Sequence, residues 1–143
     1  MGDQEKHPEN QPNEKFIGEG ERSALTILKS IFGNECEYKT QYLFSKLMKT
    51  DFYDTLSDRQ LRETLDIVIF RPTKSTIVVR VQDKHHDSIL KTSQDRVQKQ
   101  MLEWNGCIVI DLWYKECPTL WSEEINEQSI EEVSSYLRKA NLL

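Results

Sequence analysis

Polar residues that could hold a metal ion lie in or beside two short apolar runs. Asp66 is a lone carboxylate inside LDIVIF, and the run STIVVRVQ leads into Asp83 and Lys84. Side chains alternate along a strand, so Arg80, Gln82 and Lys84 are expected to share one face. A carboxylate inside an apolar run is costly unless it is paired, hydrogen-bonded or bound to a cation. Asp66 therefore has two interpretations: it pairs with Arg80, or it converges with Gln82 and Lys84 on a divalent cation.

The second interpretation would support phosphodiester cleavage. That reaction needs a hard cation held by oxygen ligands, a bound water of lowered pKa and a positive group near the developing charge. Asp66 would be the principal metal ligand and Gln82 a second one through its amide oxygen. Lys84 would position the water or stabilise the charge.

The elements around these residues are predicted to form a sheet. The strand signals at 64–70 and 75–82 are separated only by RPTK, which predicts an antiparallel hairpin. The apolar run at 107–113 predicts a strand covered on both faces. A helix expected at 87–104 makes the link between the last two strands a crossover, so we expect these strands to be parallel.

Helices are predicted on both sides of the hairpin. Apolar residues repeat at helical spacing from Glu19 until Gly33. The segment EYKTQYLF suggests a further strand, followed by a short helix at 43–48 and a loop at 50–63 with at most one helical turn. Ser129 and Glu132 have the spacing of a capping box before a C-terminal helix. Within the helix at 87–104, one apolar face is expected to pack on the sheet: Ile89, Leu90, Val97, Met101 and Leu102.

The order helix, three strands, helix, strand, helix predicts an α/β domain with a mixed central sheet flanked by helices. With 143 residues, 37% of them apolar, the chain is expected to form one domain at 19–143. Residues 1–18 combine acidic and polar residues with two prolines and predict a disordered tail.

Composition also bounds where the protein acts. No apolar run approaches the roughly 18 residues of a membrane span, so no membrane partner is expected. The three cysteines show no CxxC spacing, which argues against a disulfide framework or a thiolate zinc site. We therefore expect a cytoplasmic protein.

The net charge of −5 hides an uneven distribution. Residues 22–115 carry fifteen basic and twelve acidic side chains, whereas both ends are acidic. A local basic face could meet a phosphate backbone, although interspersed surface charge explains the same numbers. On the crossover helix, Lys91, Arg96 and Lys99 are the candidate phosphate contacts.

Taken together, the segments LDIVIF, IVVRVQDKHH and NGCIVIDL, with a helix carrying Asp95, Arg96 and Lys99 between the last two, resemble the PD-(D/E)xK nuclease superfamily. The closest likeness is to the branch of very-short-patch-repair endonucleases, over about residues 19–113. The resemblance implies a restriction-endonuclease-like fold and Mg²⁺-dependent action on DNA. It also implies roles for His86 near the nucleic acid and for Glu21 as an additional metal-binding acid.

The active-site motif departs from the pattern of the family. If His86 is matched to the family histidine, Arg80 takes the place of the second acid and Gln82 that of the next polar residue. If the motif is moved by two residues, Gln82, Asp83 and Lys84 form the (D/E)xK element with a neutral amide in place of a carboxylate. Either register weakens Mg²⁺ binding.

Two functions follow from this departure. The chain is a Mg²⁺-dependent DNA nuclease, or it is an inactive relative that binds nucleic acid or a protein partner, including a second copy of itself.

Overall fold

The computed structural model describes residues 19–82, 89–113, 116–121 and 125–143. The predicted tail at 1–18 lies outside the described residues, and so do Lys84 and His86.

A four-stranded mixed sheet forms the centre of the molecule. Its strands are β1 (Glu37–Leu43), β2 (Thr64–Phe70), β3 (Ile77–Gln82) and β4 (Ile108–Trp113), in the spatial order β1-β2-β3-β4. The pairs β1–β2 and β2–β3 are antiparallel, and β3–β4 is parallel. The predicted hairpin and the parallel crossover are therefore confirmed.

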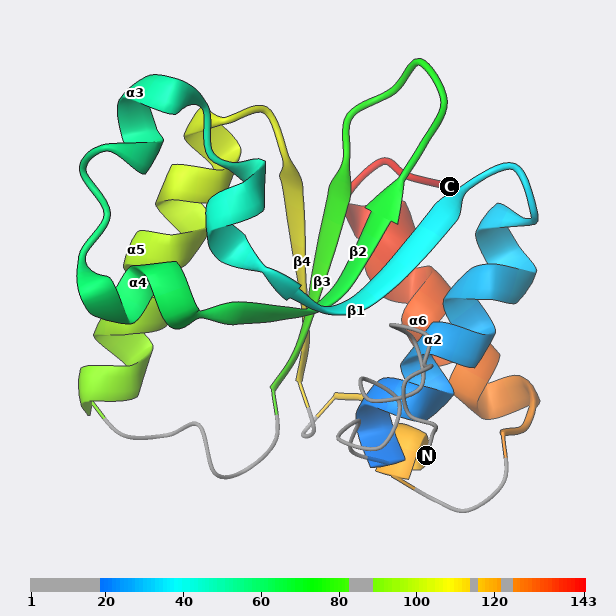
Figure 1. Ribbon diagram of the computed structural model, residues 1–143. Helices are drawn as coiled ribbons and strands as arrows, with labels where there is room; N and C mark the ends of the chain where they lie inside the picture. The colour runs from blue at the N-terminus through cyan, green and yellow to red at the C-terminus, as the bar shows by residue number, and fades with distance from the viewer. Residues whose placement is uncertain (1–18, 83–88, 114–115, 122–124) are drawn as a thin grey trace, which may run out of the picture.

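Helices cover both faces of this sheet (Figure 1). One face carries α2 (Glu19–Phe32) and α6 (Glu127–Lys139), with the short 3₁₀ helix η3 (Pro118–Trp121) nearby. The other carries α5 (Ile89–Trp104) together with three short elements: η2 (Phe44–Leu47), α3 (Thr50–Tyr53) and α4 (Asp58–Arg62). The expected α/β architecture is confirmed at this level.

Each face has its own buried cluster. The α2/α6 core contains Ala24, Ile27, Leu28, Ile67, Ile69, Ile77, Val79, Val81, Ile110, Leu112, Cys117, Leu120, Val133 and Leu137. The α5 core contains Phe44, Met48, Leu65, Val68, Val78, Met101, Leu102, Cys107 and Val109. The centre of the sheet is thus apolar on both faces, as its largely apolar strands predict.

Glycines end two of the long helices as predicted. Gly33 follows α2 with φ of 83° and donates its N–H to the carbonyl of Lys29 at 2.9 Å. Gly106 follows α5 with φ of 87°. Both residues adopt the left-handed conformation that L side chains rarely take, so the helical hydrogen-bond pattern stops there.

Other boundaries differ from the prediction. The capping box of α6 joins Asn126 to Ser129, not Ser129 to Glu132, so the helix begins one turn earlier. Asparagine caps a helix as well as serine does, and both spacings exist in this sequence. The segment at 50–63 forms the two short helices α3 and α4 in place of a single turn.

The apolar face predicted for α5 is also partly wrong. Met101 and Leu102 are buried, but Leu90 and Val97 are 69% and 45% exposed. Only the side of α5 that carries Met101 and Leu102 meets the sheet, because a helix packed on a sheet contacts it along one stripe of side chains.

Strands β1 and β2 turn over at one point. Tyr38 packs against the α2/α6 core, whereas Tyr42, four residues later on the same strand, packs against the α5 core. Residues an even number apart share a face in a regular strand. Between them Gln41 has φ of 49°, and the register places it opposite Asp66 on β2. The change of face therefore occurs where the predicted site residue Asp66 lies.

Candidate functional site

A row of polar side chains crosses the sheet at the end of the α5 core. Arg80 on β3 is paired with Asp111 on β4, and continuing the β2–β3 register from Ile67 and Val79 brings Asp66 to the same level. The row before it on this face consists of three valines of the α5 core, Val68, Val78 and Val109. The polar row thus lies at one end of the α5 face.

Arg80 is the centre of this row. Its side chain is almost fully buried, with the residue 7% exposed, and it forms a two-pronged ion pair with Asp111: Nε to Oδ1 at 2.7 Å and Nη2 to Oδ2 at 3.0 Å. Its Nη1 donates to the backbone carbonyl of Asp95 at 2.7 Å and to Oε1 of Gln98 at 3.3 Å. Arg80 thereby links β3 to β4 and to α5. The two parallel hydrogen bonds to Asp111 match the planar geometry of the guanidinium group.

Gln82 points into the same network. The residue is 2% exposed, and its Nε2 donates to Oδ1 of Asp111 at 3.0 Å. Asp111 therefore accepts hydrogen bonds from two side chains of β3. Sequence reasoning missed Asp111, although the available signal was the same as for Asp66: a single acid inside an apolar run, CIVIDLW.

Asp66, at the edge of the row, accepts a hydrogen bond from the backbone of β3. Its Oδ2 accepts the backbone N–H of Val81 at 2.8 Å. The β2–β3 pairing runs only as far as Ile67 and Val79, so the carboxylate supplies an acceptor where β2 no longer does. The ion pair that Arg80 forms with Asp111 also differs from the predicted pairing with Asp66, since the partner comes from β4 and not from the hairpin.

A small pocket opens at this row. It has a volume of about 60 Å³ and brings together the predicted residues Asp66 and Gln82 with Arg80, Lys91 and Asp95. The Nζ of Lys91 lies 3.5 Å from Oδ1 of Asp95, one helical turn further along α5. The volume suffices for a few water molecules and is far below that of a site for a drug-sized ligand.

Glu21 is linked to this region through β1. Its Oε1 accepts from Nε2 of Gln41 at 3.2 Å, and Oε1 of Gln41 accepts from Oγ1 of Thr64 at 3.0 Å. Thr64 lines the pocket. The first helix therefore supplies an acid to the neighbourhood of the site, but it reaches β2 by way of a glutamine.

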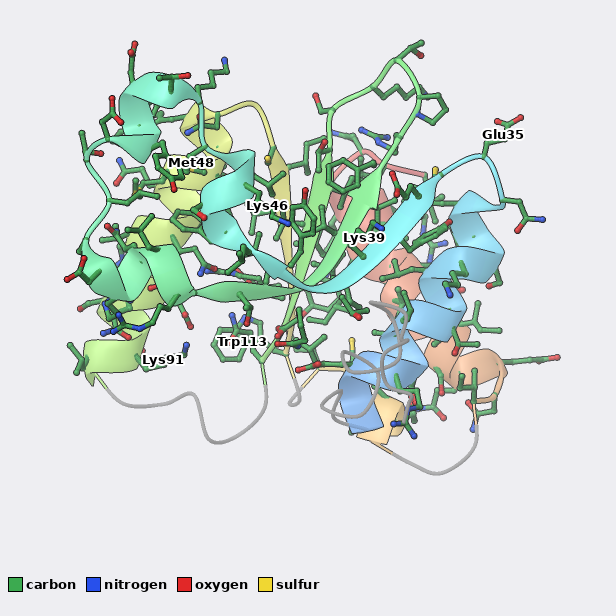
Figure 2. All side chains as sticks on the ribbon, in the orientation of Figure 1. Glu35, Lys39, Lys46, Met48, Lys91 and Trp113 are labelled. Carbon is green, nitrogen blue, oxygen red and sulfur yellow. The ribbon has the colours of Figure 1, made fainter. Side chains whose placement is uncertain are left out.

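The remaining predicted residues are spread out. Arg96 is exposed and Lys99 half-buried on α5, and neither lines the pocket. Figure 2 shows Lys91 and Trp113 at the same end of the sheet. Trp113 lies opposite Gln82 in the β3–β4 register and is 37% exposed. A partly exposed aromatic ring therefore lies beside the polar row.

The described residues by themselves do not fit a Mg²⁺ ion, and Asp83 and Lys84 of the predicted motif lie outside them. In the part of the chain that is described, no group of three or more His, Cys, Asp and Glu side chains is placed to hold a metal. A bound cation would also lie beside the Arg80 guanidinium, which already neutralises Asp111. Arg80 therefore opposes a cation at this position, and the Mg²⁺ expectation stays a prediction.

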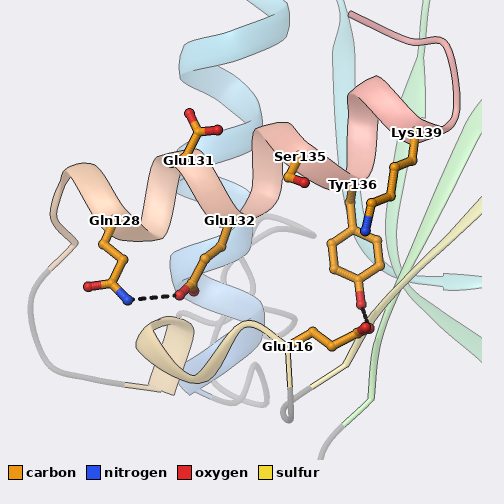
Figure 3. A pocket seen from close by; sticks show the side chains of 7 residues that line it. All are labelled: Glu116, Gln128, Glu131, Glu132, Ser135, Tyr136 and Lys139. Atoms are coloured by element: carbon orange, nitrogen blue, oxygen red, sulfur yellow. Dashed lines mark hydrogen bonds between the residues drawn. The ribbon is translucent and has the colours of Figure 1, made fainter.

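A second, wider pocket lies on α6 away from this row (Figure 3). Its volume is about 390 Å³, and its lining includes Glu116, Glu131, Glu132 and Tyr136. Glu132 accepts from Oγ1 of Thr119 at 2.6 Å, and Tyr136 donates to Glu116. None of the predicted site residues lies there.

No family model, curated protein sequence or solved structure matches this chain. Of the helices described, none is both long and apolar enough to span a bilayer.

Proposed function

We propose that the chain is a restriction-endonuclease-like domain that binds DNA at the polar end of its sheet without metal-dependent cleavage. The fold part of the proposal is supported by the order of elements: the resemblance implies a hairpin, a helix and a further strand after the first helix and strand. The strands β2, β3 and β4 and the helix α5 follow in that order.

The absence of catalysis rests on one observation, the buried ion pair between Arg80 and Asp111. Phosphodiester hydrolysis by this family requires carboxylates that face a metal ion. Here the carboxylate of Asp111 is neutralised by a guanidinium that cannot lose its proton. Asp66 and Gln82 lie beside this pair, and the Nε2 of Gln82 donates to Asp111 in the same network.

DNA binding is supported by one residue that lines the pocket and by one on the neighbouring end of β4. Lys91 offers a cation that is 44% exposed, and Trp113 offers a partly exposed ring at the same end of the sheet. Stacking of a base on an aromatic ring combined with a nearby cation is the common mode of single-strand binding. Lys99, further along α5, would extend the phosphate contacts.

Binding is measured by fluorescence anisotropy with labelled single-stranded and duplex DNA at several salt concentrations. We expect affinity that falls as salt is added, because phosphate contacts release counterions. Lys91→Ala should weaken binding, and Trp113→Ala should weaken it roughly 5- to 150-fold if one base stacks there. The matched control is Lys74→Ala, which removes one charge from the β2–β3 turn at the opposite end of the sheet. Affinity that ignores salt would indicate a protein partner instead.

Cleavage is tested on plasmid and single-stranded DNA with Mg²⁺ and Mn²⁺. We expect no product from the natural sequence. Cleavage that disappears in Asp66→Ala would contradict the proposal and restore the nuclease interpretation.

The role of Arg80 in excluding a metal has its own test. Arg80→Glu places a carboxylate between Asp66 and Asp111, so like charges repel unless a cation is added. Thermal unfolding of this variant should shift upward with Mg²⁺ or Mn²⁺, whereas the natural sequence should not respond. Lys91→Glu, which changes the same charge at the exposed mouth, is the control.

A further inference from the structure

The outer side of α5 carries a regular apolar stripe that the chain leaves exposed. Leu90, Val97 and Trp104 are 69%, 45% and 59% exposed, and they are spaced seven residues apart. Seven-residue spacing places side chains in one line along a helix, which is the seam by which two helices pack together. Isolated exposed apolar residues need no explanation, but a line of three along four turns does.

The stripe runs along the margin of α5 that adjoins α3 and α4. The centroid of the Trp104 ring lies 6.1 Å from that of the Phe52 ring on α3. Met101, three residues before Trp104, accepts a hydrogen bond from Gln60 on α4. No described element covers the stripe itself, as the exposures indicate. Figure 1 shows α5 on the same side of the sheet as α3 and α4.

We propose that a second copy of this chain packs on the stripe, with the two α5 helices antiparallel. Between the large residues of the stripe lie the exposed small and polar residues Ser93 and Gln100. An antiparallel register that sets Val97 opposite the partner's Gln100 also sets Trp104 opposite the partner's Ser93. Large side chains of each helix then enter the gaps of the other, as knobs enter holes.

The charges beside the stripe favour the same arrangement. Arg96 and Glu103 are both exposed, occupy equivalent heptad positions and carry opposite charges. In this register Arg96 of one helix lies within a turn of the partner's Glu103, and symmetry repeats the pair. A parallel pair would instead bring each residue next to its own copy, which is repulsive. The surface is therefore self-complementary, as a two-fold interface requires.

Self-association is measured on the full chain by sedimentation equilibrium and light scattering, without DNA. We expect the dimer to be the main species at roughly 100 μM, because a dimer with a Kd of about 1 μM is almost fully formed at that concentration. Val97→Lys places two ammonium groups near the axis and should give monomer. The matched control is Ile130→Lys on α6, which is 40% exposed and should remain dimeric. Circular dichroism verifies that each variant is folded.

A charge exchange distinguishes this partner from any other. Arg96→Glu and Glu103→Arg, made singly, should each raise the dimer Kd roughly two- to fivefold, because like charges then meet. The double variant should recover the Kd of the natural sequence, since the two charges of each ion pair are then exchanged and opposite charges meet again. A monomeric natural chain at the highest concentration would overturn the proposal, and so would a double variant no tighter than the single ones.

Discussion

The two faces of the sheet are built by different physical means. The α2/α6 face is apolar along β2 and β3, where its buried members include Ile67 and Val79. The α5 face is apolar only over half its length and then changes to the row of Arg80 and Asp111. Burial stabilises the first without directional requirements, whereas the second requires every polar group to find its partner. The second face is therefore where a ligand could be recognised.

The largest expected effect tests the polar half of the α5 face. Arg80→Met removes the cation and leaves the Asp111 carboxylate with less compensation, so the free energy of unfolding should fall by about 3–5 kcal/mol. Urea denaturation at pH 7 measures it. The double variant Arg80→Met with Asp111→Leu should recover most of the loss, because both buried charges are then gone. A double variant as unstable as the single one would show that the ion pair is not the cause.

The apolar face gives the matching test. Leu28→Ala on α2 empties space in the α2/α6 core, where Leu28 is fully buried. Large-to-small changes of this kind lower the free energy of unfolding by about 2–5 kcal/mol. No second substitution should compensate here, since no charge is involved. A loss below about 1 kcal/mol would mean that this face is not packed as described.

Alkaline pH should destabilise both faces, because burial raises the pKa of the Cys107 thiol in the α5 core as well as that of Cys117 in the α2/α6 core. Burial in the α2/α6 core, with added effects of Glu132 and Glu116, raises the pKa of the Cys117 thiol from 9.0 to about 12. Above pH 9 the unfolded chain releases this proton while the folded chain keeps it. The folded state then binds more protons, so stability falls as pH rises from 9 to about 12.

Cys117→Ala should flatten this decline, with only a modest loss of stability at pH 7 because few atoms are removed. Chemical denaturation at a series of pH values measures the slope. Leu120→Val, in the same core and without a titrating group, should lower stability equally at every pH. An unchanged slope in Cys117→Ala would place the alkaline transition elsewhere.

The smallest effects concern one helix cap on each side of the sheet. The side chain of Asn126 caps α6, and that of Ser57 caps α4. Replacing either by alanine should cost about 1 kcal/mol, because one backbone N–H loses its acceptor. Thermal unfolding followed by circular dichroism measures both. Asn34→Ala, just past the end of α2, is a surface control that should change little.

Much of the fold could be predicted from local signals. The strand TLDIVIF has the predicted bounds of β2, and the glycine stops after α2 and α5 lie where expected. These features depend on residues that are neighbours in the sequence. The cap of α6 was misplaced by one turn because two capping pairs overlap there, and only packing selects between them.

The site was predicted in part. Asp66 and Gln82 do line one pocket, but the ion-pair partner of Arg80 is Asp111, 31 residues further along the chain. Alternation along the hairpin predicts on which face of the sheet each residue of β2 and β3 lies. It does not say which residue of a third strand will stand beside Arg80, since that depends on the β3–β4 register.

The sequence by itself determined the four strands and the long helices, their order, and the two acids isolated inside apolar runs. Periodicity and capping depend on residues that are close together in the sequence, so they can be recognised from the sequence alone. The tertiary structure alone decided that Arg80 faces Asp111, that β1 and β2 turn over at Gln41, and that Leu90 and Val97 remain exposed. Each of these outcomes depends on which segments pack together. Because packing joins residues far apart in the chain, no window of the sequence contains it.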